Sequence, residues 1–236
     1  MAVNIAQASA SLQIAAQDQQ ALKQVWENIQ PDSCPYSYNF HMHTIYSDGQ
    51  LDPEELIEQA VTIGLKGLAI TDHHTVGGYK IAQSWLEQWQ QQTSPSTPVP
   101  KLWTGVEITA DLLGTEVHIL GYAFDPEHAG LQPYLNSKAP RQGDAQAAAV
   151  IVALHQAGGL AVLAHPERYR RSATELIPIA AHLGIDGVES YYAYSNPDPW
   201  HPSPNQTQKV KQLSATYNLF NTCGTDTHGL NLLRRL

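Results

Sequence analysis

The stretch GLKGLAITDHHT, residues 64–75, indicates both the fold and the chemistry of this chain. Gly64 follows an amphipathic segment that starts at Asp52-Pro53, an N-cap and a first-turn proline, so a helix is expected to end there. Residues 67–71 are small or apolar and predict a short buried strand. The polar sequence Asp-His-His, residues 72–74, follows this strand directly. The sequence therefore predicts a helix–strand unit that ends in side chains of the metal-binding type.

The same alternation of strands and helices continues along the chain. We expect strands at 36–41, 67–71, 102–106, 117–122, 160–164, 187–189 and 218–223, and further helices near 79–91, 145–157, 174–183 and 204–217. This alternation is typical of an α/β domain with a parallel sheet or barrel. We divide the chain into an N-terminal helical extension, residues 1–35, and one α/β domain, residues 36–236. In the extension, Leu22, Trp26 and Ile29 have helical spacing and predict a helix that packs on the domain.

Length and composition indicate a globular protein. The chain has 236 residues, of which 42% are hydrophobic and 15% charged, which excludes a disordered chain or a coiled coil. A net charge of -9 disfavours contact with nucleic acid or anionic membranes, unless bound metal reverses the local field. The N-terminus has no basic region, and no stretch approaches the roughly 20 apolar residues of a membrane span. We expect a cytoplasmic protein.

Metal-binding side-chain types gather where the predicted strands end. In a βα barrel these ends meet on one face, so residues far apart in the sequence could share one cavity. Imidazole and carboxylate groups suit zinc, manganese or iron, and a His-x-His sequence on an extended segment points both rings to one side. One cluster explains all of these residues together, and their number suffices for two or three ions. They are His41, His43, Asp48, Asp72, His73, His74, Glu107, His118, His165, Glu189, Asp226 and His228.

Seven segments in order resemble the successive motifs of the PHP (polymerase and histidinol phosphatase) family. They are FHMHTIYSDG (40–49), LAITDHHT (68–75), GVEIT (105–109), VHILGY (117–122), LAVLAHPERY (160–169), GVES (187–190) and CGTDTHG (223–229). The resemblance implies a distorted (β/α)7 barrel with a metal site at the C-terminal ends of the strands. It also implies a metal-dependent phosphoesterase, most similar to the stand-alone branch that acts on nucleotides and nucleic-acid 5′ ends.

The resemblance implies two or three divalent ions, Mn, Zn or Fe, as cofactors. By motif, one ion would be held by His41, His43, Glu107 and Asp226; a second by bridging Glu107 with His118 and His165; a third by Asp48, His73 and His228. Asp72 and Glu189 would orient ligands. His74 would be a general acid for the leaving group or a structural residue.

The expected reaction is hydrolysis of phosphate esters, of nucleotides or of the 5′ ends of short RNA or DNA, as in a nucleotidase or a 5′–3′ exonuclease. Bound divalent ions lower the pKa of water toward about 7, so we hypothesise a bridging hydroxide near Glu107. The aromatic segment 191–200 could stack a nucleobase or pack on itself. The candidate phosphate- and substrate-binding residues are Arg168, Tyr169, Ser203 and His201.

Two alternatives stay open. One is a small-metabolite phosphatase such as a histidinol phosphatase, and the other is a non-catalytic metal-binding module. Every position that matches a ligand motif is intact, which disfavours the module. The chain has no long Lys/Arg run, which favours mononucleotides or short oligonucleotides over long duplexes. We expect no membrane association and no obligatory protein partner.

Overall fold

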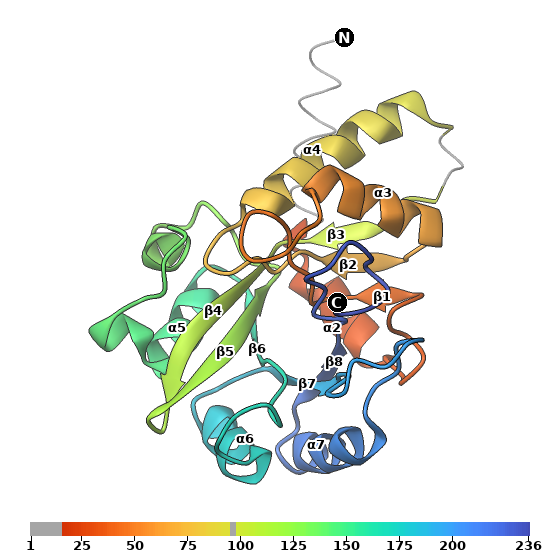
Figure 1. The fold of residues 1–236 in the computed structure, drawn as a ribbon. Coiled ribbons are helices and arrows are strands. Elements are labelled where there is room, and N and C mark those ends of the chain that lie inside the picture. The colour runs from red at the N-terminus through yellow and green to blue at the C-terminus, as the bar shows by residue number, and fades with distance from the viewer. Residues whose placement is uncertain (1–15, 95–97) are drawn as a thin grey trace.

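The computed structural model describes residues 16–94 and 98–236. The part of the predicted N-terminal helix that falls on residues 1–15 lies outside the described residues. The elements, shown in Figure 1, are α2 (Gln19–Trp26), β1 (Tyr38–Asn39), α3 (Pro53–Ile63), β2 (Gly67–Ala69), α4 (Gly77–Gln92), β3 (Lys101–Trp103), β4 (Gly105–Leu112), β5 (Thr115–Tyr122), the 3-10 helices η1 (Ala129–Tyr134) and η2 (Gln142–Ala145), α5 (Ala147–Gln156), β6 (Leu160–Leu163), α6 (Ala173–His182), β7 (Gly187–Tyr191), α7 (Pro204–Thr216) and β8 (Phe220–Cys223).

The strands form two sheets, in the orders β1-β2-β3 and β4-β5-β6-β7-β8. Helices α3 to α7 lie around the outside of these sheets (Figure 1). Isolated parallel bridges join the sheets at two places, where Met42 pairs with Thr227 and His73 pairs with Glu107. The segments that carry the predicted ligands therefore lie side by side, as the α/β interpretation requires.

One pair of strands differs from the predicted parallel alternation. The expected strand 102–106 divides at Thr104 into β3 and β4, and β4 continues into β5 through a two-residue turn at Leu113 and Gly114. Both turn residues have positive φ, 57° and 68°, as tight hairpins require. β5 consequently runs antiparallel to β4 and β6. The reversal places His118, which pairs with Thr109, near the start of its strand but on the same edge as the other ligands.

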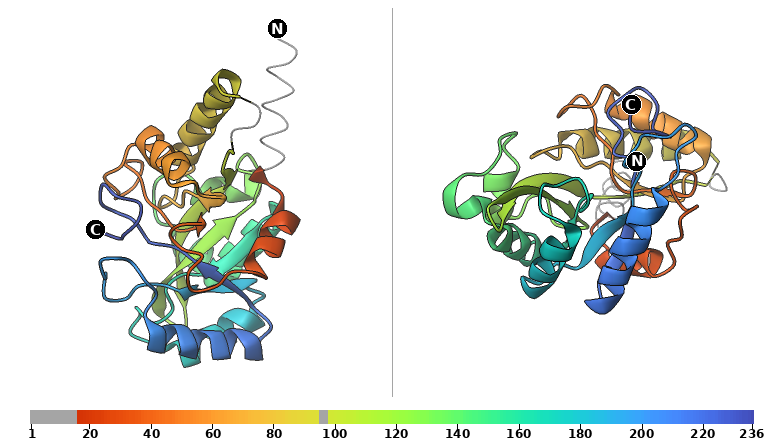
Figure 2. Two further views of the ribbon diagram at one scale, coloured as in Figure 1. Left: turned by 90° about the vertical axis from the view of Figure 1, so that its right-hand side faces the viewer. Right: turned by 60° about the horizontal axis from the view of Figure 1, so that its bottom comes forward.

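Helix α2 packs against the interior of the strand arrangement. Leu22 and Trp26 belong to a buried cluster with residues from six strands, and the Trp26 ring lies 6.2 Å from Phe40 and 5.3 Å from Tyr122. Figure 2 shows α2 on the side of the strands opposite the C-terminal segment. The predicted packing of this helix is confirmed, whereas the boundary at residue 35 stays a prediction. None of the described helices is long and apolar enough to span a membrane.

Candidate metal centre

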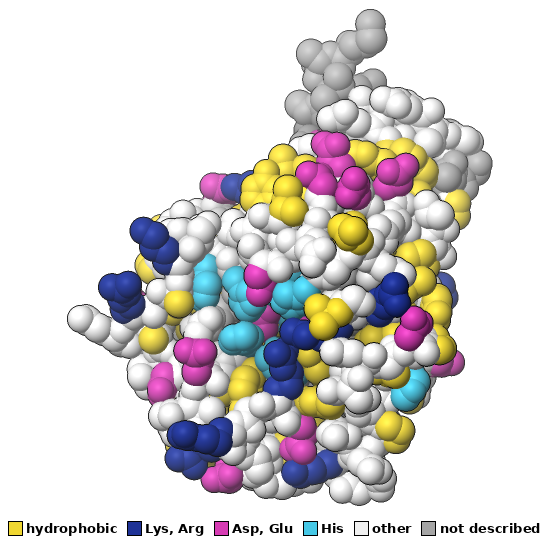
Figure 3. All heavy atoms as spheres, in the orientation of Figure 1, with side chains coloured by type: hydrophobic (Ala, Val, Ile, Leu, Met, Phe, Trp, Pro, Cys, Tyr) yellow, Lys and Arg dark blue, Asp and Glu magenta, His cyan; other side chains and the backbone are white. Residues whose placement is uncertain are grey.

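The predicted ligands converge on one face of the molecule. Figure 3 shows histidine side chains in the middle of this face, with acidic side chains among them and Lys or Arg side chains beside them. Of the nine predicted ligands, only His165 is outside the three groups of mutually close ligand atoms, and its Nε2 lies 3.3 Å from Glu107 Oε1. Within each group the ligand atoms lie within 4.8 Å of one another. The groups are His41, His43, Glu107 and Asp226; His43, Asp48, His73 and His228; and His73, Glu107 and His118.

Glu107 lies between two sets of histidines. Its Oε2 is 3.0 Å from Nε2 of both His41 and His43, whereas its Oε1 is 2.7 Å from Nδ1 of His118. The side chain is only 1% exposed. Because each carboxylate oxygen faces a different set, the geometry suits a carboxylate that bridges two ions.

Several ligand atoms have close neighbours but no hydrogen bond. His43 Nε2, Glu107 Oε1 and His118 Nδ1 are buried, and among the described residues none of them has a partner at hydrogen-bonding angles. A buried polar atom without a partner costs roughly 1–3 kcal/mol. Divalent cations would satisfy these atoms, and mixed imidazole and carboxylate donors suit Zn, Mn or Fe. The residues present therefore fit the metals that the sequence predicts.

The electrostatics of the cluster also suit cations. Burial alone would lower the pKa of His41, but Glu189, Glu107 and Asp226 outweigh burial and raise it well above its usual value. His43 behaves similarly: Asp226 and Glu107 raise its pKa to about 9 against the effect of burial. Since a ligating imidazole is neutral, a bound divalent ion would displace one proton from each of these two rings.

Two carboxylates outside the ligand groups fix the orientation of ligands. Glu189 accepts hydrogen bonds from His41 Nδ1 and from the His165 backbone N–H, both at 2.9 Å. This leaves His41 Nε2 directed at the cluster. Asp72 accepts from the Thr44 backbone N–H at 2.7 Å and from the Ser47 hydroxyl at 2.8 Å, which fixes the loop that follows His43. Such outer partners typically set ligand orientation and metal affinity.

The backbone is strained at the site. His74, His165 and Asp226 have φ values of 56°, 26° and 55°, a region that non-glycine residues rarely adopt and that clusters at functional sites. Gly224 is required beside them because a Cβ there would clash with His41. The tight turn after β8 therefore brings the Asp226 carboxylate into the cluster.

His74 is better explained as a structural residue than as a general acid. Its Nε2 lies 3.1 Å from the Thr109 hydroxyl, and burial lowers the pKa of the ring. A neutral imidazole is a poor general acid, because its single N–H is far less acidic than an N–H of the protonated ring. Of the two alternatives left open by the sequence, the structure favours the structural one.

Of the four predicted phosphate-binding residues, only Arg168 has a side chain at the metal centre that could bind phosphate. Arg168 lies at the metal centre: its Nη1 donates to Asp226 Oδ2 at 3.0 Å, and the side chain is 40% exposed. The Tyr169 hydroxyl instead accepts from the His118 backbone N–H and donates to the Ala164 carbonyl. The Ser203 hydroxyl accepts from the Tyr194 backbone N–H. Both hydroxyls therefore hold the backbone, and we do not assign them to phosphate.

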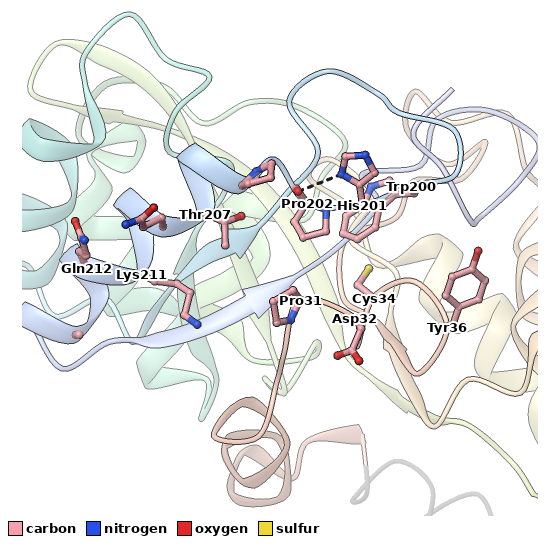
Figure 4. Close-up of a pocket in the computed structure, with 13 residues that line it drawn as sticks. Pro31, Asp32, Cys34, Tyr36, Trp200, His201, Pro202, Thr207, Lys211 and Gln212 are labelled. Atoms are coloured by element: carbon pink, nitrogen blue, oxygen red, sulfur yellow. Dashed lines mark hydrogen bonds between the residues drawn. The ribbon is translucent and has the colours of Figure 1, made fainter.

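His201 lies at a different place. It lines an apolar pocket of about 900 Å³, between the segment that precedes β1 and helix α7, and Figure 4 shows it there beside Trp200 and Cys34. None of the nine predicted ligands lines this pocket. In the aromatic segment Tyr191, Tyr192 and Trp200 are buried, and the Tyr192 and Tyr194 rings lie 4.8 Å apart. Of the two alternatives, the structure favours a segment that packs on itself over a platform for a nucleobase.

Two residues at the centre were missed. The Tyr192 hydroxyl donates to Asp226 Oδ2 at 2.7 Å, and Arg235 Nε donates to the same oxygen at 2.8 Å. Tyr192 lies in the aromatic segment 191–200, and Arg235 lies next to Arg234 near the end of the sequence. No motif marks either residue, so only the fold could place them.

Comparisons with known proteins point to one family. A model of the PHP domain family matches residues 39–193, which contain seven of the nine predicted ligands, all except Asp226 and His228. The 5′-3′ exoribonucleases Rnm of Salmonella typhimurium and Escherichia coli are 25% and 26% identical to the chain, each over 81% of it and 85% of the relative. A 3′,5′-nucleoside bisphosphate phosphatase of Chromobacterium violaceum is 32% identical over 52% of this chain and 39% of the relative.

Solved structures show the same fold. A protein assigned as a metal-dependent phosphoesterase from Bifidobacterium adolescentis superposes with a TM-score of 0.66 at 23% identity, over 85% of this chain and 90% of that protein. A protein described as an amidohydrolase from Chromobacterium violaceum, with bound sulfate, superposes with a TM-score of 0.65 at 20% identity, over 82% of this chain and 88% of that protein. At this identity the likeness concerns the fold alone.

Proposed function

Because the chain belongs to the PHP domain family, we propose that its metal centre hydrolyses phosphate esters of nucleotides or of the 5′ ends of short RNA or DNA. Family membership, with relatives named exoribonuclease and phosphatase, makes the chain a metal-dependent phosphoesterase. The nucleotide or 5′-end substrate is the proposal. One observation carries the hydrolytic role: eight His and Asp side chains from across the sequence converge around Glu107.

We also propose that the two sheets together form one distorted barrel. The interior cluster draws buried side chains from β2, β3, β5, β6, β7 and β8, and Tyr38 of β1 packs against it, so these strands surround a common core. With the two bridges between the sheets, this arrangement supports the distorted barrel that the family resemblance implies.

Each part of the centre has a chemical task. The three ligand sets would hold two or three divalent ions, which supply an activated water at neutral pH and neutralise phosphoryl oxygens when bound. Glu107 would hold two of the ions at a fixed separation through its two oxygens. Glu189 and Asp72 keep the rings of His41 and His43 in position, and Arg168 would bind a phosphate oxygen through the donors that its bond to Asp226 leaves open.

Two observations support a short nucleotide substrate. The relatives that align over most of the chain are named exoribonucleases, and a partial match is named a nucleoside bisphosphate phosphatase. A long duplex would need an extended basic groove, whereas this chain is acidic overall and has only 13 Lys and Arg residues against 22 Asp and Glu. A mononucleotide or a short 5′-phosphorylated strand needs only the cations next to the metal centre.

The test is Mn²⁺-dependent product release by the wild type and by His41→Ala. The panel contains 3′-phosphoadenosine 5′-phosphate, mononucleotides, 5′-phosphorylated oligonucleotides and histidinol phosphate, with nucleotide products also separated by chromatography. His182→Ala is the matched control because His182 is exposed on α6. We expect turnover of a nucleotide or oligonucleotide by the wild type and the control, and its loss in His41→Ala. Preference for histidinol phosphate would support the metabolite phosphatase instead, and no turnover despite bound metal would support a non-catalytic module.

A further inference from the structure

One carboxylate oxygen of Asp226, Oδ2, accepts hydrogen bonds from side chains of three different loops. Asp226 Oδ1 faces the metal ligands, at 3.3 Å from His41 Nε2 and 3.2 Å from His43 Nε2. Its Oδ2 accepts from Arg168 at 3.0 Å, from the Tyr192 hydroxyl at 2.7 Å and from Arg235 Nε at 2.8 Å. These donors follow β6, β7 and β8 respectively. The predicted metal ligands thus lie next to Oδ1 of Asp226, and the two guanidinium groups lie next to Oδ2 of the same carboxylate.

Two cations share this single carboxylate oxygen. One negative charge cannot neutralise both guanidinium groups, and Asp226 would also give charge to a metal ion through Oδ1. The Arg168 side chain is 40% exposed and that of Arg235 is 19% exposed, so both reach the surface of the site. Among the described residues, the Arg235 side chain has partners only at Asp226 and Tyr192, which leaves terminal N–H donors of its planar fork for another acceptor.

The chain holds Arg235 firmly in this position. Its carbonyl accepts from the backbone N–H groups of His228, at 2.7 Å, and Gly229, at 3.2 Å. Leu232 is fully buried, and its carbonyl accepts from the Thr227 hydroxyl and the Asn39 side chain. The segment that carries Arg235 is therefore bound to the same loop that presents the predicted ligands Asp226 and His228.

The neighbouring arginine differs. The Arg234 side chain forms an exposed ion pair with Asp198 at 2.8 Å and makes no contact with Asp226. Exposed ion pairs contribute little to stability. Arg234 therefore offers a control with the same residue type, one position away, whose side chain is outside the site.

We propose that Arg235 is a substrate-binding residue that, together with Arg168, holds the phosphate group to be hydrolysed. Its Nε–H stays on Asp226, and its outer N–H groups donate to a non-bridging phosphate oxygen. Guanidinium groups match phosphate with paired hydrogen bonds, and such charge-assisted bonds are the strong ones. This inference rests on the proposed function, because it concerns the phosphate that the metal centre would act on.

The experiment compares Arg235→Gln, Arg235→Lys and Arg234→Gln in the metal-loaded protein. The first measurement is binding of inorganic phosphate by calorimetry, which needs no turnover. The second is KM and kcat for the best substrate of the panel, and the third is bound metal per chain. We expect Arg235→Gln to weaken phosphate binding and raise KM by roughly 10–100-fold with unchanged metal content. Arg235→Lys should recover part of the loss, and Arg234→Gln should match the wild type.

The outcomes separate substrate binding from positioning of Asp226. If Arg235→Gln loses metal but binds phosphate normally once metal is restored, Arg235 only positions the carboxylate and the inference is overturned. Equal effects of Arg234→Gln and Arg235→Gln would also overturn it, since general charge would then explain the result. If Arg235→Gln does not fold, the lysine variant decides: full wild-type phosphate affinity would contradict a role for the guanidinium fork. Absence of turnover in the wild type with Arg235-dependent phosphate binding would contradict the proposed function alone.

Discussion

At the scale of single residues, the carboxylates of Glu107 and Asp72 make different kinds of contact. Glu107 presents one oxygen to His41 and His43 and the other to His118. Asp72 instead uses its oxygens on Thr44 and Ser47, and the Ser47 hydroxyl lies 3.4 Å from His43 Nδ1. The proposed ligand and supporting roles thus fall to different carboxylates that look equivalent in the sequence.

Asp72→Asn tests this division at the residue scale. The amide that replaces one carboxylate oxygen cannot accept a hydrogen bond through nitrogen, so at least one of the Thr44 and Ser47 donors loses its partner. We expect metal affinity to fall by about 10–100-fold while the fold is kept, because the His43 loop loses its support. Metal titration followed by calorimetry measures this. Asp144→Asn, at an exposed position, is the control, and equal affinities of both variants would contradict the supporting role.

The residue types of the site were predictable, but not all of their partners. Strand ends carrying His, Asp and Glu follow directly from the sequence, and the structure brings them together. Arg235 and Tyr192 were not predictable because their role depends on three loops that meet at Asp226 Oδ2. For the same reason the sequence could not show that the Tyr169 and Ser203 hydroxyls bind the backbone.

At the element scale, secondary structure was predicted where periodicity was strong. The helix from Asp52 to Gly64 has the expected cap, in which the Asp52 side chain accepts from the Glu54 backbone N–H, and Gly64 has a φ of 81°. The β4–β5 hairpin was missed because Leu113-Gly114 is a weak turn signal: leucine rarely takes the positive φ that it has here. That hairpin reverses β5 and explains how a residue near the start of a strand reaches the centre.

Helix α2 should be an integral part of the domain. Trp26 packs among rings of the interior cluster, so Trp26→Ala should lower the free energy of unfolding by about 3–5 kcal/mol. Gln24→Ala, on the exposed side of the same helix, should change it by less than about 0.5 kcal/mol. Urea unfolding of both variants measures the difference. A loss below about 1 kcal/mol for Trp26→Ala would mean that the domain core does not need this helix.

The contact between α5 and the start of β7 should depend on pH. Asp186 accepts from His155 at 2.8 Å and raises the pKa of His155, against burial and Lys23. Because the folded-state pKa lies above the unfolded value of about 6.5, the stabilisation is complete below about pH 6.5. It is lost as the pH rises through the folded-state pKa. The His155 side chain is 38% exposed, so the contribution should stay below about 1 kcal/mol.

His155→Ala should therefore destabilise the protein more at pH 5.5 than at pH 9. Unfolding of the wild type and the variant in the presence of EDTA measures this, since chelation keeps the metal equilibrium out of the comparison. The site histidines titrate in both proteins and cancel in the difference. A destabilisation that grows from pH 5.5 to pH 9 would contradict the assigned ion pair.

The whole molecule is acidic, and bound metal changes its charge substantially. Three divalent ions would bring the formal net charge from -9 to -3, with all of the added charge at one site. Against the effect of burial, nearby histidines lower the pKa of Glu107 and of Asp226, and Arg168 and Arg235 also donate to Asp226. An acidic chain can therefore attract a phosphorylated substrate to this face when metal is present.

Chelation should destabilise the molecule as a whole. An ion that binds only the folded state adds about 2.7 kcal/mol of stability at a free concentration of 100 times its Kd. We expect EDTA to lower the thermal midpoint of the metal-loaded wild type, and Mn²⁺ to restore it. His41→Ala should show a much smaller change. Equal EDTA effects in both proteins would place the stabilising metal somewhere other than at this cluster.

The most direct test of the central claim is an anomalous difference map from crystals of the protein soaked in MnCl₂. The account predicts two or three peaks around Glu107, one of them among His41, His43, Glu107 and Asp226 and another beside Asp48, His73 and His228. Glu107 should lie between two of the peaks. A map without peaks at these residues, or with manganese bound only elsewhere on the surface, would contradict the assignment of this cluster as the metal centre.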